Sequence, residues 1–283
     1  MIQAGLVLEG GGMRGVYTSG VLDFFLEKGM IFESCYGVSA GACNACSYLS
    51  GQSGRGYHVI VDYLDDKNYC GMYSFLKTGD IFGVDMAYDK IPNELNPYDY
   101  EAFSQYEGKF YAVATDITTG KPEYFRIQNM REDIIKVRAS ASLPWVSNNV
   151  IIDGKPYLDG GVSDSIPIRR SIKDGNRKNV VILTRDADYQ KTPDGMAKFS
   201  AIRYHDYPAL IHNMRVRHLR YNKTLEYLDK AVAAGAAFVI QPEEPVQIKR
   251  IEKDTEVLQQ YYELGYADAE AAYPKLQEYL GIL

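Results

Sequence analysis

The sequence predicts an α/β fold of three layers, in which a mainly parallel sheet is flanked by helices, with a mostly helical C-terminal third. Strand and helix signals alternate through the first half of the 283 residues, which is typical of a parallel sheet with crossover helices. Charged and apolar residues then mix at helical spacing over residues 204–227 and 254–279. No Pro/Gly/Ser-rich linker interrupts the chain. We therefore expect one domain over residues 1–283, with a core of about residues 5–185 and a helical extension of about residues 186–283.

The first two strand–helix pairs carry the clearest signals. Leu6-Val7-Leu8 is a short apolar run before glycine, as in a buried strand, and apolar residues at helical spacing from Val16 to Leu26 follow. The pair repeats in Cys35 to Val38 and in the small-residue helix from Gly41 to Leu49. Further strands are expected at residues 110–114, 123–127, 150–152, 180–183 and 238–240, and further helices at residues 132–139 and 166–172.

Charge and composition restrict the partners. The formal net charge of −6 disfavours nucleic acid. The densest basic stretch, Arg215 to Arg220, is either a solvated helix face or a contact with anionic lipid. Several tyrosines of the C-terminal third either pack helices together or line a cleft: Tyr261, Tyr262, Tyr266 and Tyr273.

The sequence also bears on location and cofactors. No apolar run approaches the ~20 residues of a membrane-spanning helix, and the N-terminus lacks a basic stretch followed by a long apolar one, so we expect a cytoplasmic protein. The four cysteines do not suggest a disulfide framework. Cys43 and Cys46 form a C-x-x-C that is either a pair of small buried helix residues or a redox or metal motif. We favour the buried residues and predict no metal and no cofactor.

A glycine loop lies between the first strand and its helix. In Gly10-Gly11-Gly12-Met13-Arg14-Gly15, consecutive glycines let backbone N–H groups turn toward a negative charge, and the next helix adds its dipole. Arg14 either steadies the loop and brings positive charge to the site or forms a surface ion pair. The same segment satisfies G-x-G-x-x-G, with Glu33 at the distance of a ribose-binding acid, so the loop alone leaves a dinucleotide site open.

A second motif, Gly37-Val38-Ser39-Ala40-Gly41, matches the nucleophile elbow G-x-S-x-G in its required context of strand, turn and helix. A serine on so sharp a turn has strained dihedral angles, and side chains at Gly37 or Gly41 would clash there. The pattern predicts that Ser39 projects its hydroxyl above the sheet at the start of a helix. A structural serine in a turn is the alternative.

A serine nucleophile needs a base, and the sequence offers a carboxylate in Leu158-Asp159-Gly160-Gly161. Two glycines after an acidic residue at a strand end leave room for its carboxylate to approach another loop. None of the four histidines, His58, His205, His212 and His218, follows a late strand as the histidine of a catalytic triad does. Asp159 is therefore the better candidate base. In a dry pocket, hydrogen-bonded to Ser39, it could accept the hydroxyl proton.

These three motifs, in this order, resemble those of the patatin-like phospholipases over about residues 5–168. The similarity includes Ala139-Ser140-Ala141-Ser142-Leu143-Pro144, which resembles a segment beside the family's site. Glu9 stands where many members have aspartate, and Asp-Gly-Gly replaces the commoner Asp-Gly-Ala. The tail after about Arg185 matches poorly and resembles only a bacterial branch of the family.

The resemblance implies a lipid acyl hydrolase with a Ser-Asp dyad and no metal. It assigns Ser39 as nucleophile, Asp159 as proton acceptor, and Gly10, Gly11, Gly12 and Arg14 as the oxyanion element. Supporting positions around the elbow and the base are Gly37, Gly41, Gly160 and Gly161. The expected partners are a lipid or ester substrate and, transiently, a membrane surface. Two alternatives stay open: a catalytically silent lipid-binding protein, and a dinucleotide-binding protein that uses the loop from Gly10 to Gly15.

Overall fold

The computed structural model describes residues 1–245 and 247–282, and the strands in this part of the chain form one sheet. The strand order is β5-β6-β3-β2-β1-β7-β8, and β4 pairs with β3 outside this path. The strands β3, β2, β1, β7 and β8 are parallel, whereas β4, β5 and β6 pair antiparallel. The strand bounds are β1 Ile2–Leu8, β2 Phe32–Val38, β3 Lys109–Asp116, β4 Pro122–Ile127, β5 Val150–Ile152, β6 Lys155–Asp159, β7 Asn179–Ile182 and β8 Phe238–Ile240.

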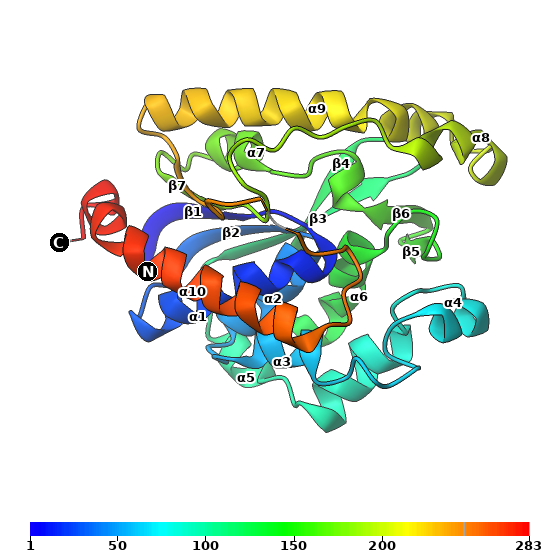
Figure 1. Cartoon of the computed structure of the whole chain (residues 1–283), viewed down its shortest axis with the longest axis horizontal. Helices are drawn as coiled ribbons and strands as arrows, with labels where there is room; N and C mark the ends of the chain where they lie inside the picture. Colours follow the sequence, from blue (N-terminus) through cyan, green and yellow to red (C-terminus); the bar gives the residue numbers. More distant parts are fainter. Residues whose placement is uncertain (246, 283) are drawn as a thin grey trace.

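Helices cover both faces of this sheet, so the predicted three-layer α/β fold is confirmed (Figure 1). The short helix α7 and the long helix α9 lie above the sheet in Figure 1, and α1, α2 and α10 lie below it. The bounds are α1 Gly15–Glu27, α2 Ala40–Leu49, α3 Arg55–Val61, α4 Met72–Thr78, α5 Tyr100–Ser104, α6 Met130–Ala141, α7 Ile168–Lys173, α8 Ser200–Arg203, α9 Pro208–Ala233 and α10 Thr255–Leu280, with the 3-10 turns η1 Gly12–Arg14, η3 Gly160–Val162 and η4 Gly195–Phe199 and the π-helix η2 Met86–Leu95.

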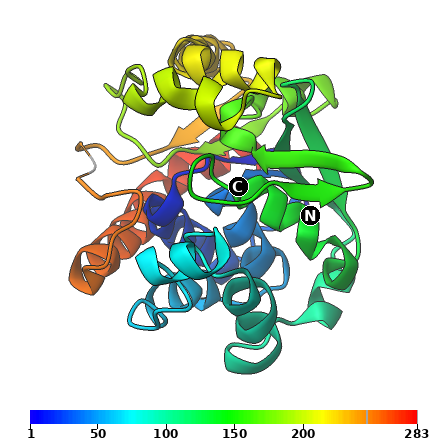
Figure 2. The same cartoon turned by 90° about the vertical axis from the view of Figure 1, so that its right-hand side faces the viewer.

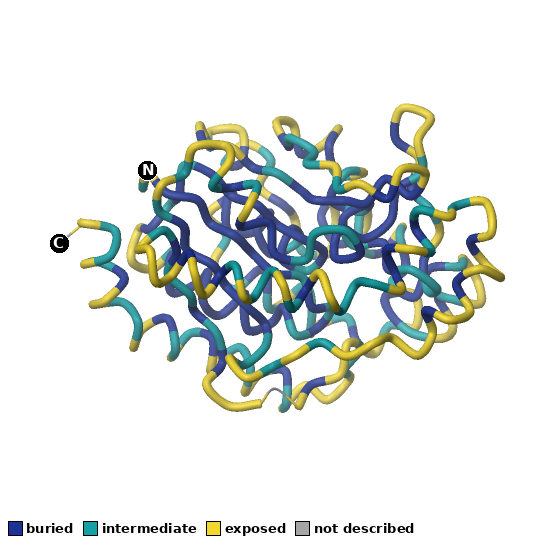
Figure 3. The backbone as a smooth tube through the Cα atoms, turned by 90° about the horizontal axis from the view of Figure 1, so that it is seen from above, coloured by how far each residue is buried: buried dark blue, intermediate teal, exposed yellow. Residues whose placement is uncertain are grey.

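The apolar run of β1 is continuous because both faces of the sheet are covered. Leu6 and Leu8 are fully buried in the core cluster that includes α1 and α2, and Val7 is fully buried in the cluster that includes α9. Successive side chains of a strand point to opposite faces, so each face receives its own apolar residues. Figure 3 shows the result as buried strands through the centre of the molecule, with exposed segments around them.

The hairpin of β5 and β6 turns within Asp153-Gly154-Lys155-Pro156. Only Asp153 and Gly154 form the turn, both at positive φ (49° and 75°). The strand β6 already begins at Lys155, which pairs with Ile152. Two residues at positive φ form the tight turn that matches strand twist, which makes a four-residue turn unnecessary. Figure 2 shows this hairpin at the end of the molecule that faces the viewer.

The edge of β3 explains where β6 ends. One edge of β3 pairs with β4 from Phe110 to Thr115, and the other pairs with β2 only as far as Val113. Since a strand has two edges, β6 occupies the edge that β2 leaves, and Asp159 pairs with Ala114 there. The last residue of β6 therefore lies beside the carboxyl end of β2.

The C-terminal third is mostly helical, as predicted, and it also completes the sheet through β8. α9 begins at Pro208, four residues after the predicted start, since proline favours the first turn of a helix. The tyrosines of α10 mainly pack this helix on α1: Tyr266 and Tyr273 both contact the Phe24 ring edge-on, and the Tyr262 hydroxyl donates to Asp23 (2.8 Å). Within the described residues, no helix is long and apolar enough to cross a bilayer.

Candidate active site

The glycine loop follows β1 and passes directly over the start of α2. A Cβ atom at Gly10 would lie 2.8 Å from Cβ of Ser39, and one at Gly12, whose φ is +60°, would lie 2.5 Å from the carbonyl oxygen of Arg250. Only glycine permits so close an approach. Among the described residues, the amides of Gly10, Gly11 and Gly12 donate to no backbone carbonyl, whereas the Met13 amide donates to Arg250 (3.0 Å). Three amides beside Ser39 are thus available to an anion.

Ser39 occupies the turn between β2 and α2 with φ 55° and ψ −124°, a conformation that non-glycine residues rarely adopt. Its carbonyl accepts the amides of Ala42 (2.9 Å) and Cys43 (3.1 Å), which starts the helix. The flanking glycines are required by contact: a Cβ at Gly37 would lie 2.5 Å from the Ala42 Cα atom, and one at Gly41 would lie 2.6 Å from the Leu8 carbonyl. The geometry is that of a nucleophile elbow.

Asp159 ends β6 beside this elbow and is buried, with 2% of its surface exposed. Its Oδ1 atom accepts the Gly161 amide (2.7 Å), and Thr115 donates its hydroxyl to the Asp159 carbonyl (2.8 Å). A Cβ at Gly160 would lie 2.0 Å from the Val113 carbonyl, so the residue after Asp159 must be glycine for the chain to pass β3. These contacts fix the carboxylate in one position.

The end of α6 holds both candidate dyad residues. The Ser140 hydroxyl accepts the Ser39 amide (2.9 Å) and donates to the Val113 carbonyl (2.6 Å). Two residues later, the Ser142 carbonyl accepts the Asp159 amide (2.7 Å). The segment from Ala139 to Pro144, which the sequence analysis singled out, therefore joins the elbow to the end of β6.

Burial raises the pKa of Asp159, because water no longer stabilises the charged form. The nearby Ser39 hydroxyl and the charge of Arg217 act in the opposite direction. The Oδ2 atom is buried and accepts no hydrogen bond of regular geometry among the described residues. This oxygen is therefore open to a proton, and Ser39 is close enough to influence its charge.

Glu9 has a structural function that the sequence analysis missed. It is buried with 3% of its surface exposed, and its carboxylate accepts the Thr184 amide (2.7 Å), the Thr184 hydroxyl (3.0 Å) and the Tyr221 hydroxyl (2.6 Å). These bonds join the end of β1 to the segment after β7 and to α9. An acidic residue before a glycine loop was the available signal, but we interpreted it only as a family variation.

Arg217 was also missed, because it lies within the basic stretch that we interpreted as a solvated helix face or a lipid contact. Arg215 and Arg220 are indeed exposed, but Arg217 is half-buried and donates through Nε to the Gly161 carbonyl. Burial lowers the pKa of Arg217, while the charge of Asp159 raises it. One turn of α9 thus places a guanidinium group beside the candidate base.

Two pockets meet at Ser39. The smaller one is polar, with a volume of about 30 Å³, and it is lined by Ser39, Asp159, the glycine loop and Arg14. The larger one has a volume of about 170 Å³ and is mainly apolar. Gly12, Ser39 and Leu143 line both. A group bound at the Ser39 hydroxyl can therefore extend into an apolar space on one side and a polar space on the other.

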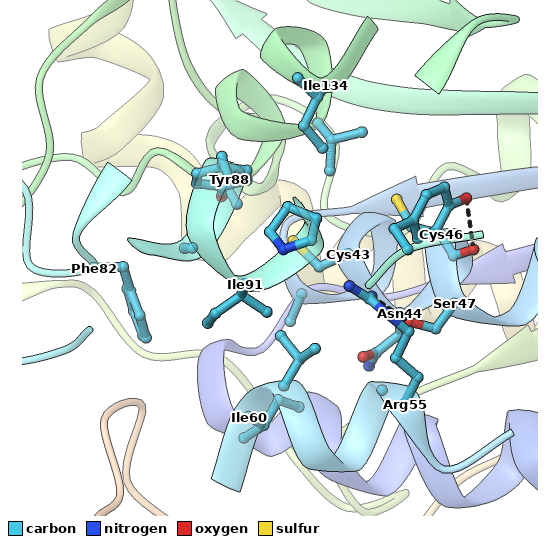
Figure 4. A pocket seen from close by; sticks show the side chains of 18 of the residues that line it. Cys43, Asn44, Cys46, Ser47, Arg55, Ile60, Phe82, Tyr88, Ile91 and Ile134 are labelled. Atoms are coloured by element: carbon cyan, nitrogen blue, oxygen red, sulfur yellow. Dashed lines mark hydrogen bonds between the residues drawn. The ribbon is translucent and has the colours of Figure 1, made fainter. Parts of the chain in front are cut away.

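About half of the lining of the apolar cavity comes from residues 55–100, for which the sequence predicted no elements. Figure 4 shows Ile60 of α3, Ile91 of η2 and Ile134 of α6 lining it from three directions. Its polar groups bond mainly to the protein: Asn44 donates to the Gly15 carbonyl (2.6 Å), and Arg55 donates to the Ser47 hydroxyl (3.1 Å) and to a backbone carbonyl. The cavity therefore suits an apolar ligand.

The remaining predicted groups lie elsewhere. None of the four histidines lines either pocket among the described residues, and His58 pairs with Asp62 on the surface (3.1 Å). Glu33 lies at the start of β2, six residues before Ser39, which is about 20 Å along a strand. It cannot hold a ribose at the glycine loop, so the structure disfavours the dinucleotide alternative. Cys43 and Cys46 lie on α2, as small helix residues.

Two family models match the chain, and several known proteins are similar to it. A family model described as patatin-like phospholipase matches residues 6–172, and one described as a domain of unknown function (DUF6363) matches residues 207–281. The uncharacterized protein YjjU of Escherichia coli (strain K12) is 27% identical over 92% of this chain and 74% of its own length. The probable lipid hydrolase 463L of Invertebrate iridescent virus 6 is 26% identical over 70% of this chain and 75% of its own.

Other relatives are much longer than this chain. Lysophospholipase nte1 of Aspergillus terreus is 30% identical over 58% of this chain but only 11% of its own length. Among solved structures, VipD from Legionella pneumophila aligns with a TM-score of 0.49 at 14% identity, covering 96% of this chain and 67% of that chain. The match of a family model to more than half of the chain, over the segment that carries the glycine loop, the elbow and Asp159, shows that the chain belongs to the patatin-like phospholipases, a family of lipid ester hydrolases.

Proposed function

We propose that this lipid ester hydrolase cleaves a carboxylic ester through an acyl-enzyme on Ser39, with Asp159 as the base. The observation that carries the proposal is the position of Ser39, which lines both the apolar cavity and the polar pocket that contains Asp159 and the glycine loop. An acyl chain would lie in the apolar cavity, and its ester carbonyl would lie at the Ser39 hydroxyl.

The first half-reaction uses groups that the fold holds in place. Asp159 accepts the hydroxyl proton as Oγ of Ser39 attacks the ester carbonyl, and the amides of the glycine loop bind the oxyanion. The raised pKa of the buried Asp159 makes this carboxylate a stronger base than a solvated one. The intermediate then expels the alcohol, which takes the proton back from Asp159, and the acyl group remains on Ser39.

Water completes the reaction. Asp159 accepts a proton from a water molecule as its oxygen attacks the acyl-enzyme, and the second tetrahedral intermediate expels Ser39, which recovers the proton. The products are a carboxylic acid and the free enzyme. Arg14 supports the oxyanion element from the next turn of the chain, since it lines the polar pocket and carries a positive charge.

Labelling with a fluorophosphonate tests the nucleophile. We expect wild type to be modified at Ser39 and Ser39→Ala to be unlabelled, while Ser104→Ala, which changes an exposed serine on α5, keeps full labelling. Asp159→Asn should fold normally and turn over at least ~10²-fold more slowly. If Ser39→Ala hydrolyses p-nitrophenyl esters at the wild-type rate, the assignment is wrong. If wild type binds liposomes but releases no fatty acid, the chain is the silent lipid-binding protein instead.

Transient contact with a membrane surface is the second part of the proposal. Leu76 on α4 and Ile202 on α8 are 78% and 77% exposed, and Figure 1 places both helices at the same end of the molecule. Arg203 of α8 donates to the Trp145 carbonyl (2.8 Å), in the loop that also contains the cavity residue Leu143. We expect Leu76→Ser and Ile202→Ser to reduce sedimentation with lipid vesicles; unchanged sedimentation would exclude this surface.

A further inference from the structure

Positive charge is concentrated in the polar pocket beside Ser39. Of its lining residues, five are cationic and two, Glu9 and Asp159, are acidic. This is the reverse of the whole chain, whose formal net charge is −6. The five cations come from the glycine loop and, for the most part, from the C-terminal third: Arg14, Arg185, Lys191, Arg217 and Arg250.

The two carboxylates do not balance these cations. Glu9 is already bonded to Thr184 and Tyr221, and Oδ1 of Asp159 accepts the Gly161 amide. In the described part of the chain, the partly buried Arg14, Lys191 and Arg217 form no ion pair with a carboxylate. Buried like charges repel one another unless an anion lies between them.

Burial and, to a smaller extent, the neighbouring cations lower the pKa values of two of these groups. Burial and the charge of Arg217 lower the pKa of Lys191 to about 7, and burial and the charge of Arg185 lower the pKa of Arg14 to about 10. The Nε atom of Arg14 is buried without a hydrogen-bond acceptor among the described residues. A buried donor of this kind lacks a partner that a ligand could provide.

Aromatic rings and the side chain of Asn222 hold Lys191 and Arg185 in position. Nζ of Lys191 lies 4.4 Å from the centre of the Tyr221 ring, and the guanidinium of Arg185 lies 4.5 Å from that of Tyr189. The Lys191 backbone bonds the Asn222 side chain in both directions (2.9 and 3.1 Å). Lys191 and Arg185 are thus positioned before any ligand arrives.

We propose that this pocket binds the phosphate of the lipid substrate and selects a lipid whose phosphate is a terminal monoester close to the cleaved ester. The inference rests on the proposed function, since the ester must lie at Ser39. With the acyl chain in the apolar cavity, the alcohol part of the substrate faces the cationic pocket, because Ser39 separates the two. A phosphate group attached to that alcohol supplies charge and acceptor oxygens to several cations at once.

The same features disfavour zwitterionic head groups. A phosphomonoester carries a charge of about −1.5 to −2 at pH 7, whereas a phosphodiester with choline carries one negative charge and a quaternary ammonium. The positively charged side chains of the pocket repel that ammonium.

The test compares three substrates that share one acyl chain: lysophosphatidic acid, lysophosphatidylcholine and monoacylglycerol. We expect wild type to show kcat/KM about 10- to 100-fold higher for lysophosphatidic acid than for monoacylglycerol, the effect of one or two charged hydrogen bonds. Lys191→Met and Arg185→Met should each lower this ratio about 10-fold. The matched control, Lys223→Met, removes an exposed charge from α9 and should keep the wild-type ratio. Monoacylglycerol hydrolysis by each variant shows that it is folded.

Each outcome decides the proposal. A ratio near one in wild type, or a high ratio that both variants retain, overturns it, and equal hydrolysis of lysophosphatidylcholine overturns the monoester preference. If the ratio is near one but inorganic phosphate changes the rate with monoacylglycerol, the pocket binds free phosphate and not a head group. Monoacylglycerol hydrolysis that persists in Ser39→Ala would instead overturn the proposed function, which separates the two failures.

Discussion

The strained backbone conformation of Ser39 leads to a prediction about the stability of the folded protein that does not depend on the catalytic mechanism. Its φ of 55° and ψ of −124° lie where only glycine is comfortable. A non-glycine residue held in such a region costs about 1–3 kcal/mol. Replacing Ser39 with glycine removes this strain, and replacing it with alanine keeps the strain, although both variants lack the hydroxyl.

The greater flexibility of the unfolded glycine variant offsets part of the stability that it gains from the relief of backbone strain. Glycine makes the unfolded chain more flexible than alanine does, by about 0.4–1 kcal/mol in free energy. The Ser39 amide still donates to Ser140 in both variants, so that bond does not distinguish them. We therefore expect Ser39→Gly to be more stable than Ser39→Ala by about 0.5–2 kcal/mol in the free energy of unfolding.

Urea denaturation followed by circular dichroism measures this difference. The matched control is Ser50 at the other end of α2, a buried serine with ordinary dihedral angles (φ −91°, ψ 3°), where alanine should be more stable than glycine by about 0.4–1 kcal/mol. The sign of the difference should thus reverse between the two sites. Equal stabilities at Ser39, or a more stable alanine variant, would refute strain at the elbow.

Three further predictions follow from the site. Gly160→Ala places a Cβ atom 2.0 Å from the Val113 carbonyl, so we expect a displaced Asp159 and a loss of esterase activity of at least ~10²-fold, with a normal activity contradicting the geometry. Glu9→Gln replaces one carboxylate oxygen, which accepts hydrogen bonds from Thr184 or Tyr221, with an amide group that donates. This variant should lower the free energy of unfolding, measured by urea denaturation, by about 1–3 kcal/mol. Because burial raises the pKa of Asp159, kcat/KM for a neutral ester should fall as the pH drops through this raised pKa. The positive charge of Arg217 lowers the pKa of Asp159, so Arg217→Gln should move this fall in kcat/KM to higher pH. A pH profile that does not shift in the variant would exclude Asp159 as the base.

The convergence of the motifs could be predicted because strand order determines it. Parallel neighbours end at one edge of a sheet, so a loop after β1 and an elbow after β2 must lie together. The approach of Asp159 depends on β6 taking the edge of β3 that β2 leaves, whereas the sequence indicates only a strand end there. That these residues act as nucleophile and base stays a prediction, as does the cytoplasmic location.

The apolar cavity could not be predicted, for physical reasons. Its walls come from α3, from the π-helix η2 with Pro92 inside it, and from short helices that lack a long apolar period. Arg217 illustrates the same limit on a long helix. Helical spacing shows that Arg215, Arg217 and Arg220 point in different directions, but not which of them faces a pocket, because that depends on how α9 packs on the sheet.

The division of the site between two stretches of the chain has an evolutionary consequence. The glycine loop, Ser39 and Asp159 fall within residues 6–172, whereas four of the five pocket cations lie beyond them. In the proposed mechanism, mutations in the last hundred residues can therefore diversify which alcohol is recognised while the bond-breaking apparatus is inherited intact. Arg217 is the exception: it contacts Gly161 and acts on the charge of Asp159, so its replacement would alter recognition and reactivity together.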